Sequence, residues 1–255
     1  MKFGFVVPVY NHGSTLESVV QSLEAYNLPI IVVDDGNNQV NKDCISAVAK
    51  KHRLVTVVTR AKNGGKGKAL ASGVRKAHEL GLTHILQIDS DGQHDTGRIP
   101  RFLELSQQHP EAVICGYPEY DADAPKARVN GRRIANRWIH IVTISCEIVD
   151  GMIGFRIYPV EPYYKMLTHH AIIDGRMGCD IDILVHFSWA GVPIISESVK
   201  VSYPADGVSN FRMVRDNMHI AGTYTRLCAG MLVRLPKLLF RAVRRSASAR
   251  RRKSE

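Results

Sequence analysis

The first 117 residues alternate between short apolar runs and longer segments with the hydrophobic spacing of a helix. The apolar runs predict strands at Phe3–Val9, Ile30–Val33, Leu54–Thr59, His84–Ile88 and Ala112–Gly116. Helices are predicted between them at Ser14–Ala25, Asn41–Lys51, residues 66–80 and Ile99–Gln108. Strands that alternate with helices form right-handed β-α-β units and build a mostly parallel sheet flanked by helices. The pattern therefore predicts an α/β fold.

The second half of the chain is less regular. It predicts a loop at Tyr117–Pro125, helices at Val129–Ile148 and Ile181–Trp189, and strands at Ile153–Tyr158 and Ile194–Tyr203. Helical spacing resumes at Met213, with a kink expected at Pro236. We expect a catalytic domain at 1–215, a basic amphipathic helical region at 216–245 and a disordered basic tail at 246–255. Near the N-terminus, Ser14 and Glu17 have the spacing of a capping box.

The least ordinary segments of the first half follow directly after predicted strands. Ligands of parallel sheets bind beyond the carboxyl ends of the strands, so these segments are expected to converge on one edge. They are Pro8–Asn11, Asp34–Gly36, Asn63–Lys68 and Asp89–His94.

Asp89-Ser90-Asp91 is the segment with the clearest chemistry. Two carboxylates at i and i+2 just past a strand can both reach a hard divalent cation, and Mg²⁺ or Mn²⁺ prefers such oxygen ligands. Gln93 and His94 follow within reach. The alternative is that the acids only form a turn or cap the next helix.

Three other segments have both a structural and a functional interpretation. Asn63–Lys68 combines backbone N–H groups at a helix start with two lysines, which suits a phosphate, although it lacks the Walker A spacing and can be a simple turn. Asp34-Asp35 either forms a turn or binds a base or ribose. Asp180 and Asp182 lie near a helix start, where acids are favoured by the helix dipole, and their spacing lets at most one face a site.

Charge is concentrated at the C-terminal end. The chain has a net charge of +10, and residues 226–255 contain ten basic residues and one acid. On a helical wheel, five cations cluster on one side (Arg234, Lys237, Arg241, Arg244, Arg245) and apolar residues occupy the other (Leu232, Leu235, Leu239, Ala242, Val243). This pattern predicts a helix that lies on an anionic membrane surface, and the alternative is a helix packed on the core. The nearly neutral remainder argues against a nucleic-acid-binding protein.

Several other classes are excluded by simple counts. The five cysteines include no CxxC pair, which argues against a zinc site or a redox dithiol and predicts free thiols in a reducing compartment. The opening apolar run is too short for a signal peptide. No uncharged apolar stretch reaches the ~18 residues of a membrane-spanning helix, so none is expected.

Six motifs occur together in the order found in family 2 glycosyltransferases, and the sequence resembles that family. The resemblance is greatest to the branch of dolichyl- and polyprenyl-phosphate sugar transferases. The matching segments are Pro8-Val9-Tyr10-Asn11 after the opening strand, Ile31–Gly36, Asn63–Leu70, Asp89–His94, Arg133 with Asn136, and Asp150 with Gly154-Phe155-Arg156. They span roughly residues 3–215, and each is weak alone.

The resemblance implies a GT-A type fold and assigns roles to these residues. The residues implied at the nucleotide are Pro8, Tyr10, Asn11, Asp34, Asp35, Lys66, Asp89 and Ser90. Those implied at a Mg²⁺ or Mn²⁺ ion are Asp89, Asp91 and Gln93. Asp180 matches the position of a catalytic base, and Arg133, Arg156 and Arg212 are candidates for an anionic acceptor. The metal would neutralise the charge that develops on the leaving nucleoside diphosphate.

Two departures from the polyprenyl-phosphate pattern concern the acceptor. Ile153 replaces the family's serine, and Pro204–Arg212 lacks the basic residues of the family's R-x-x-G-x-S-K stretch. The sequence therefore predicts an inverting, metal-assisted transferase that moves a sugar from a nucleotide-sugar donor to a lipid or lipid-linked acceptor. It is expected at the cytoplasmic face of the membrane, as a peripheral protein. The alternatives are a lipid phosphate as nucleophile and, more remotely, a sugar-1-phosphate nucleotidyltransferase, whose Gly-rich loop is missing after the first strand.

Overall fold

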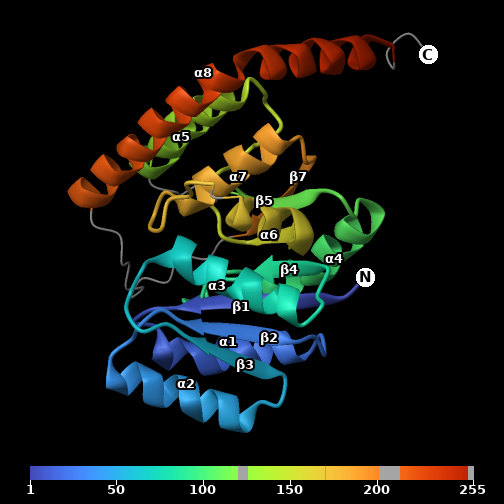
Figure 1. Ribbon diagram of the computed structural model, residues 1–255. Coiled ribbons are helices and arrows are strands. Elements are labelled where there is room, and N and C mark those ends of the chain that lie inside the picture. The colour runs from blue at the N-terminus through green and yellow to red at the C-terminus, as the bar shows by residue number, and fades with distance from the viewer. Residues whose placement is uncertain (120–125, 170, 201–212, 252–255) are drawn as a thin grey trace.

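A central sheet organises the molecule (Figure 1). The computed structural model describes residues 1–119, 126–169, 171–200 and 213–251. The strands are β1 (Phe3–Val9), β2 (Ile30–Asp34), β3 (Val55–Thr59), β4 (His84–Gln87), β5 (Val113–Glu119), β6 (Arg156–Pro159) and β7 (Ile194–Lys200). Within these residues they form one sheet in the order β3-β2-β1-β4-β6-β5-β7. Only β6 runs antiparallel to its two neighbours, which confirms the predicted mostly parallel sheet.

Helices cover both faces of the sheet. They are α1 (Gly13–Glu24), α2 (Gln39–Lys51), α3 (Lys66–Glu79), α4 (Ile99–Gln108), α5 (Lys126–Thr143), α6 (Val160–Thr168), α7 (Cys179–Ala190) and α8 (Met213–Arg251), with a short 3-10 turn at Thr96–Arg98. α1, α2 and α4 contribute to one hydrophobic core, while α3 and α5 to α8 contribute to the other. Strand side chains alternate between the two cores. Residues 30–33 of β2 are therefore all apolar, because both faces of the strand are covered.

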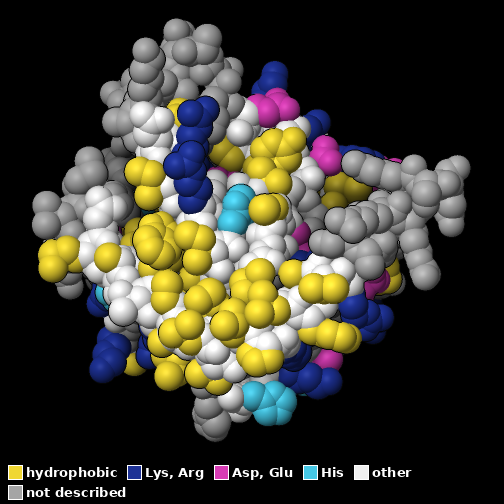
Figure 2. Space-filling view, turned by 90° about the horizontal axis from the view of Figure 1, so that it is seen from above, with side chains coloured by type: hydrophobic (Ala, Val, Ile, Leu, Met, Phe, Trp, Pro, Cys, Tyr) yellow, Lys and Arg dark blue, Asp and Glu magenta, His cyan; other side chains and the backbone are white. Residues whose placement is uncertain are grey.

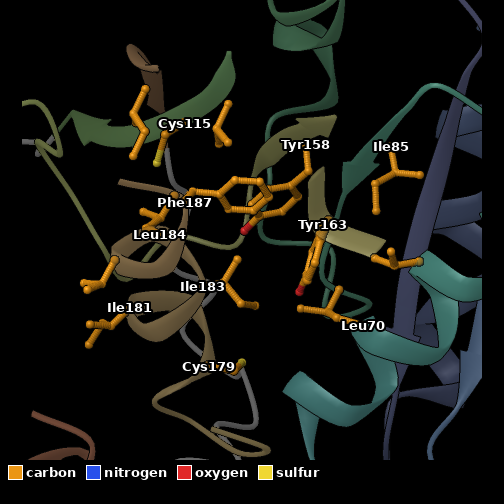
Figure 3. Close-up of a cluster of buried hydrophobic side chains, with 14 of the residues drawn as sticks. Leu70, Ile85, Cys115, Tyr158, Tyr163, Cys179, Ile181, Ile183, Leu184 and Phe187 are labelled. Atoms are coloured by element: carbon orange, nitrogen blue, oxygen red, sulfur yellow. The ribbon is translucent and has the colours of Figure 1, made fainter. Parts of the chain in front are cut away.

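An aromatic cluster anchors the second core between the sheet and α7 (Figure 3). Tyr158 of β6 stacks on Phe187 of α7 with ring centroids 5.5 Å apart. Tyr163 of α6 meets Phe187 edge-on at the same centroid distance. These contacts fix α6 and α7 against β6, and α7 is the helix on which Asp180 lies.

Several boundaries differ from the sequence predictions for physical reasons. The capping box is wrong, because α1 begins at Gly13 without a side-chain cap and Glu17 pairs with Lys51 instead. β5 continues to Glu119 into the predicted loop, because it pairs with β7 along its whole length. Its Pro118 is tolerated because β6 pairs only with Ile114 and Cys115, which leaves that side of the strand free.

Helix α8 is the longest element, and it extends beyond the helical region 216–245 that the sequence predicts. It runs from Met213 to Arg251, so six residues of the segment predicted to be disordered are helical, and 252–255 lie outside the described residues. Pro236 lies inside the helix, and Figure 1 shows α8 changing direction partway along.

α6 has no counterpart among the predicted elements. In the part of the chain that the structure describes, none of the helices has the length and hydrophobicity required to cross a bilayer.

Candidate active site

Three charged side chains from distant parts of the chain meet at the carboxyl edge of the sheet. Asp89 follows β4, Lys66 begins α3, and Asp180 lies in the first turn of α7. Lys66 Nζ is 2.8 Å from Asp89 Oδ1 and 2.8 Å from Asp180 Oδ2. The predicted convergence is therefore observed for Asn63–Lys68 and Asp89–His94, and Asp180, from outside the predicted segments, joins them through Lys66.

The electrostatics of this group favour the charged forms. Burial disfavours the ammonium of Lys66, but the carboxylates of Asp180 and Asp89 outweigh burial and raise the Lys66 pKa. Burial likewise disfavours the charge of Asp89, but Lys66 and then His94 outweigh it and hold the Asp89 pKa well below its usual range. At neutral pH the site therefore contains a charged Lys66 beside the ionised carboxylate of Asp89.

Asp180 is held from behind by a buried polar layer. Gln87, the last residue of β4, donates from Nε2 to Asp180 Oδ1 over 3.1 Å. Arg156, fully buried on the paired strand β6, donates to the main-chain oxygen of Asp180 over 2.6 Å. Both carboxylate oxygens of Asp180 thus have a partner, since Gln87 binds Oδ1 and Lys66 binds Oδ2. Sequence reasoning did not identify Gln87, whose only signal is a polar residue inside an apolar strand.

Asp182 points away from this group, as the i, i+2 spacing predicts. It is fully buried, accepts from Arg226 of α8 over 2.6 Å and accepts the main-chain N–H of Asp174 over 2.5 Å. Its role is to connect α7 to α8 and to the segment before α7. Of the two acids, only Asp180 reaches the sheet edge.

Asp35 uses the backbone amides that the sequence predicted to be free for a phosphate. Its buried carboxylate accepts the N–H groups of Gly64 and Gly65 over 3.0 and 2.7 Å, and Arg60 Nε lies 2.7 Å away. Gly67 N donates to the main-chain oxygen of Gly175 over 3.0 Å. That expectation is therefore wrong for these three amides, because the loop is organised around an internal carboxylate. Lys66 is the part of this loop that reaches the site.

The remaining residues predicted at the nucleotide lie around β1 and β2. Asp34 is buried and accepts from both the main-chain N–H and the side-chain amide of Asn37. Pro8 is half-buried near the end of β1, while Tyr10 is exposed. Asn11 adopts a left-handed φ of 60°, and its N–H donates to Asn37 Oδ1. Tyr10 and Asn11 are thus the exposed members of this group.

The segment after Asp89 is a tight turn tied to α1. The main-chain oxygen of Ser90 accepts from the Thr15 hydroxyl over 2.6 Å, and Ser90 itself is buried. Asp91 Oδ1 accepts from the N–H of Gln93 over 3.0 Å. His94 Nε2 lies 3.4 Å from Asp89 Oδ2. The turn interpretation therefore holds for Asp91, whose side chain binds the main chain of the turn. The carboxylate of Asp89 instead lies beside Lys66 and His94 at the carboxyl edge of the sheet.

The donor set fits a hard divalent ion with few protein ligands. Within the described ranges, no three His, Cys, Asp or Glu side chains are grouped to hold a metal. Asp89 and Asp91 would supply carboxylate oxygens, and Gln93 would supply an amide oxygen. Mg²⁺ and Mn²⁺ accept such ligands, and Mg²⁺ is commonly held by one or two carboxylates together with water and substrate phosphates.

The arginines predicted at an acceptor have three different positions. Arg133 is exposed on α5, and its neighbour Arg132 is the residue that pairs with Asp150 over 2.5 and 2.8 Å. Arg156 is buried behind Asp180 and is not accessible from the edge. Arg212 lies outside the described residues. Arg132 was missed because two arginines stand next to each other, and the sequence does not show which of them points toward Asp150.

Comparisons of the sequence with known proteins identify the family and its relatives. The sequence profile described as "Glycosyl transferase family 2" matches residues 5–167. An uncharacterised protein of Methanocaldococcus jannaschii is 25% identical over 80% of this chain and 90% of its own length. A dolichyl-phosphate beta-glucosyltransferase of Trichomonas vaginalis is 28% identical over 62% of this chain, and the match spans only 51% of that longer protein.

A solved structure gives the same result for the fold. Glucosyl-3-phosphoglycerate synthase of Mycobacterium tuberculosis, crystallised with Mn²⁺, uridine-diphosphate-glucose and phosphoglyceric acid, superposes with a TM-score of 0.66. The match covers 89% of this chain and 80% of that one at 17% identity. The GT-A type fold that the motifs implied is confirmed.

Proposed function

The chain belongs to glycosyl transferase family 2, and we propose that it transfers a sugar with inversion from a nucleotide-sugar donor to a lipid or lipid-linked acceptor. The observation that carries this proposal is the meeting of Lys66, Asp89 and Asp180 at the carboxyl edge of the sheet. That edge offers a cation and hard oxygen donors for a diphosphate, and a carboxylate beside them for an acceptor. We assign this chemistry to the domain 1–215.

The residues around β1 and β2 would hold the donor nucleotide. Tyr10 is exposed at the edge, beside Pro8 and Asn11, and can contact the base. Asp34 and Asp35 would act from beneath, by shaping the loops that carry these groups, since both carboxylates are buried and hydrogen-bonded. This indirect role differs from the direct contact with the nucleotide that the resemblance implied, because their carboxylate oxygens already have partners inside the protein.

The diphosphate would lie against Lys66, Asp89 and the turn at Ser90. Asp89, Asp91 and Gln93 would hold Mg²⁺ or Mn²⁺, which when bound neutralises negative charge on the departing nucleoside diphosphate. Lys66 contributes a second positive charge, and it stays protonated because its two carboxylate partners raise its pKa. The relative with bound Mn²⁺ and uridine-diphosphate-glucose supports a metal and a uridine nucleotide as first candidates.

Asp180 would act on the acceptor. If the acceptor is a hydroxyl, Asp180 accepts its proton as the oxygen attacks the anomeric carbon, and general-base assistance of this kind contributes about 10²–10⁴-fold. Gln87 and Lys66 each bind one oxygen of the carboxylate and fix its direction. Attack from the face opposite the leaving group gives inversion.

A second candidate acceptor is a lipid phosphate. It is favoured by the ion pair between Asp180 and Lys66 and by the dolichyl-phosphate named for the Trichomonas vaginalis relative. A phosphate oxygen is already ionised at neutral pH and needs no base. Asp180→Asn separates the two: a loss of about 10²-fold or more in kcat indicates a hydroxyl acceptor, and a kcat close to wild type indicates a phosphate.

Either acceptor places the enzyme beside a membrane, and we propose a peripheral protein at the cytoplasmic face. The basic helical region 216–245 is the part that would meet an anionic membrane surface. Support comes from the named lipid substrate of the relative and from the concentration of cations in this region.

The decisive experiment is a thermal-shift screen of UDP, GDP and their sugar conjugates with and without Mn²⁺. A matching nucleotide stabilises the folded state by mass action, by about 2.7 kcal/mol at a hundredfold excess over Kd. Asp91→Ala is expected to abolish the Mn²⁺-dependent shift and sugar transfer. Asp43→Ala, at an exposed acid on α2, is the matched control. Unchanged nucleotide binding and transfer in Asp91→Ala would refute the proposed metal site.

A further inference from the structure

The second half of α8 binds the body of the protein through its cations. Arg241 donates to the last carbonyls of α7, with 2.9 Å to the oxygen of Trp189. Arg245 pairs with Glu147 over 2.9 Å, and the guanidinium of Arg234 lies 4.5 Å from the centre of the Trp189 ring. Three of the five cations predicted to face a membrane therefore face the protein.

The opposite side of the same helix is apolar and exposed. Val233 is 81% exposed and Phe240 is 61% exposed, although a globular protein usually packs such residues inward. At 100° per residue, the exposed apolar residues fall within an arc of about 120°. They are Leu232, Val233, Leu239, Phe240 and Val243. Figure 2, which looks down on the side where α8 lies, shows hydrophobic side chains gathered on this surface.

Helix α5 adds a second apolar stripe beside α8. Ile134, Trp138 and Ile141 recur at helical spacing and are all exposed. Tyr224 of α8 fixes the two helices together, because its hydroxyl donates to the main-chain oxygen of Ala135 over 2.8 Å. We call these three residues and the five exposed apolar residues of α8 the α5–α8 face.

The charge around the α5–α8 face identifies its occupant. Residues 129–143 and 216–245 contain nine lysines and arginines and one acid, Asp216. A second copy binding through the same face would bring like charges together, because an isologous interface pairs a surface with itself. Lys237 and Arg244 are exposed along one edge of the apolar arc of α8, and cations beside Leu, Phe and Val are the pattern of a helix at a lipid interface.

We propose that the α5–α8 face docks on an anionic lipid bilayer, with the apolar residues inserted among the lipids and α8 held to the enzyme by its arginines. The choice of a lipid also rests on the lipid-linked acceptor proposed above. The sequence pattern suggested that the whole basic side of the helix meets the membrane. In the structure that side is shared, since Arg234, Arg241 and Arg245 bind the protein while Lys237 and Arg244 remain for lipid headgroups.

Vesicle flotation with the full chain tests this assignment. Wild-type protein is expected to float with phosphatidylcholine vesicles that contain phosphatidylglycerol, and much less with phosphatidylcholine alone. The double variant Phe240→Ser/Val243→Ser is expected to partition about tenfold or more weakly, because it removes inserted apolar groups. Lys237→Glu/Arg244→Glu is expected to lose the preference for phosphatidylglycerol.

Val40→Ser is the matched control, since Val40 is 71% exposed on α2, far from α8 in Figure 1. The proposal is overturned if Phe240→Ser/Val243→Ser floats like wild type or if Val40→Ser loses as much. It is also overturned if analytical ultracentrifugation shows that the wild-type protein is a dimer and that Phe240→Ser/Val243→Ser is a monomer. The nucleotide thermal shift is measured on the same samples: its absence in wild type counts against the proposed function, and flotation alone decides the docking face.

Discussion

The glycine behind the Asp89–Lys66 ion pair gives the sharpest test of the site. A Cβ at Gly154 would lie 2.5 Å from Asp89 Oδ2 and 2.6 Å from Lys66 Nζ. Ordinary contacts of a Cβ begin at 3.4 Å, so in Gly154→Ala the carboxylate has to retreat by about 0.9 Å, the difference between 3.4 and 2.5 Å. The substitution therefore moves the acid proposed to bind the metal without removing it.

The expected cost follows from that displacement. A misplacement of about 1 Å in a catalytic group can lower the rate about 10²-fold. We therefore expect Gly154→Ala to transfer sugar about a hundredfold more slowly at saturating donor and to lose most of the Mn²⁺-dependent nucleotide shift. Gly154 is not among the glycines with positive φ, so an alanine fits its backbone and the unfolding temperature should change little.

Gly131→Ala is the matched control for this variant. Gly131 lies in α5, and a Cβ there would meet nothing within 4 Å. The control should keep full activity and gain about 0.4–1 kcal/mol in unfolding free energy. The reasoning fails if Gly154→Ala folds normally and keeps more than half of the wild-type rate, since the position of Asp89 would then be unimportant for the reaction.

Three further substitutions test other contacts. Arg132→Met leaves the buried Asp150 without its cationic partner, and we expect a loss of about 3–5 kcal/mol in unfolding free energy at neutral pH. Burial opposes the Asp150 charge, but Arg132 outweighs it and lowers the pKa below the ordinary 3.8. This stability is therefore present above that pH and disappears as pH falls through the lowered pKa, so urea unfolding curves of variant and wild type should converge in acid. Gln87→Leu removes a donor to Asp180 and should lower kcat about tenfold or more with a hydroxyl acceptor while leaving the donor KM unchanged; an equal change in both would contradict a positioning role. Arg241→Ala should release the second half of α8 to limited trypsin digestion, with little change in the unfolding temperature of the body, and unchanged digestion would refute that attachment.

The strands and the edge where the candidate site lies could be predicted because each depends on local sequence. Buried parallel strands are short apolar runs, and the acids that follow β2 and β4 mark where these strands end. The extension of β5 could not be predicted, because it depends on pairing with β7, which lies far away in the sequence. Helix α6 was missed because Val160–Thr168 is short and contains a proline in its first turn.

The residues of the site were easier to predict than their contacts. The motifs indicated Asp35 and the amides of Gly64 and Gly65 as separate ligand-binding elements, and the structure shows that they bind each other. Which member of a motif pairs with which depends on tertiary contacts. For the same reason the sequence indicated Arg133, whereas Arg132 is the residue directed at Asp150.

The direction in which α8 faces is the clearest case of such a limit, and it connects the two proposals. Periodicity shows that a helix has an apolar and a basic side, but the choice of the side that meets the protein depends on available partners, here the carbonyls that end α7. The first half of α8 is linked to the site through other residues, beginning with the hydroxyl of Thr223, which donates to Asp174. The next residue, Gly175, accepts from the N–H of Gly67 in α3 over 3.0 Å, one position beyond Lys66. A chain of contacts thus connects α8 to the segment that carries Lys66. If α8 binds a bilayer as proposed, the proposed transfer site would be held at a fixed position relative to the membrane.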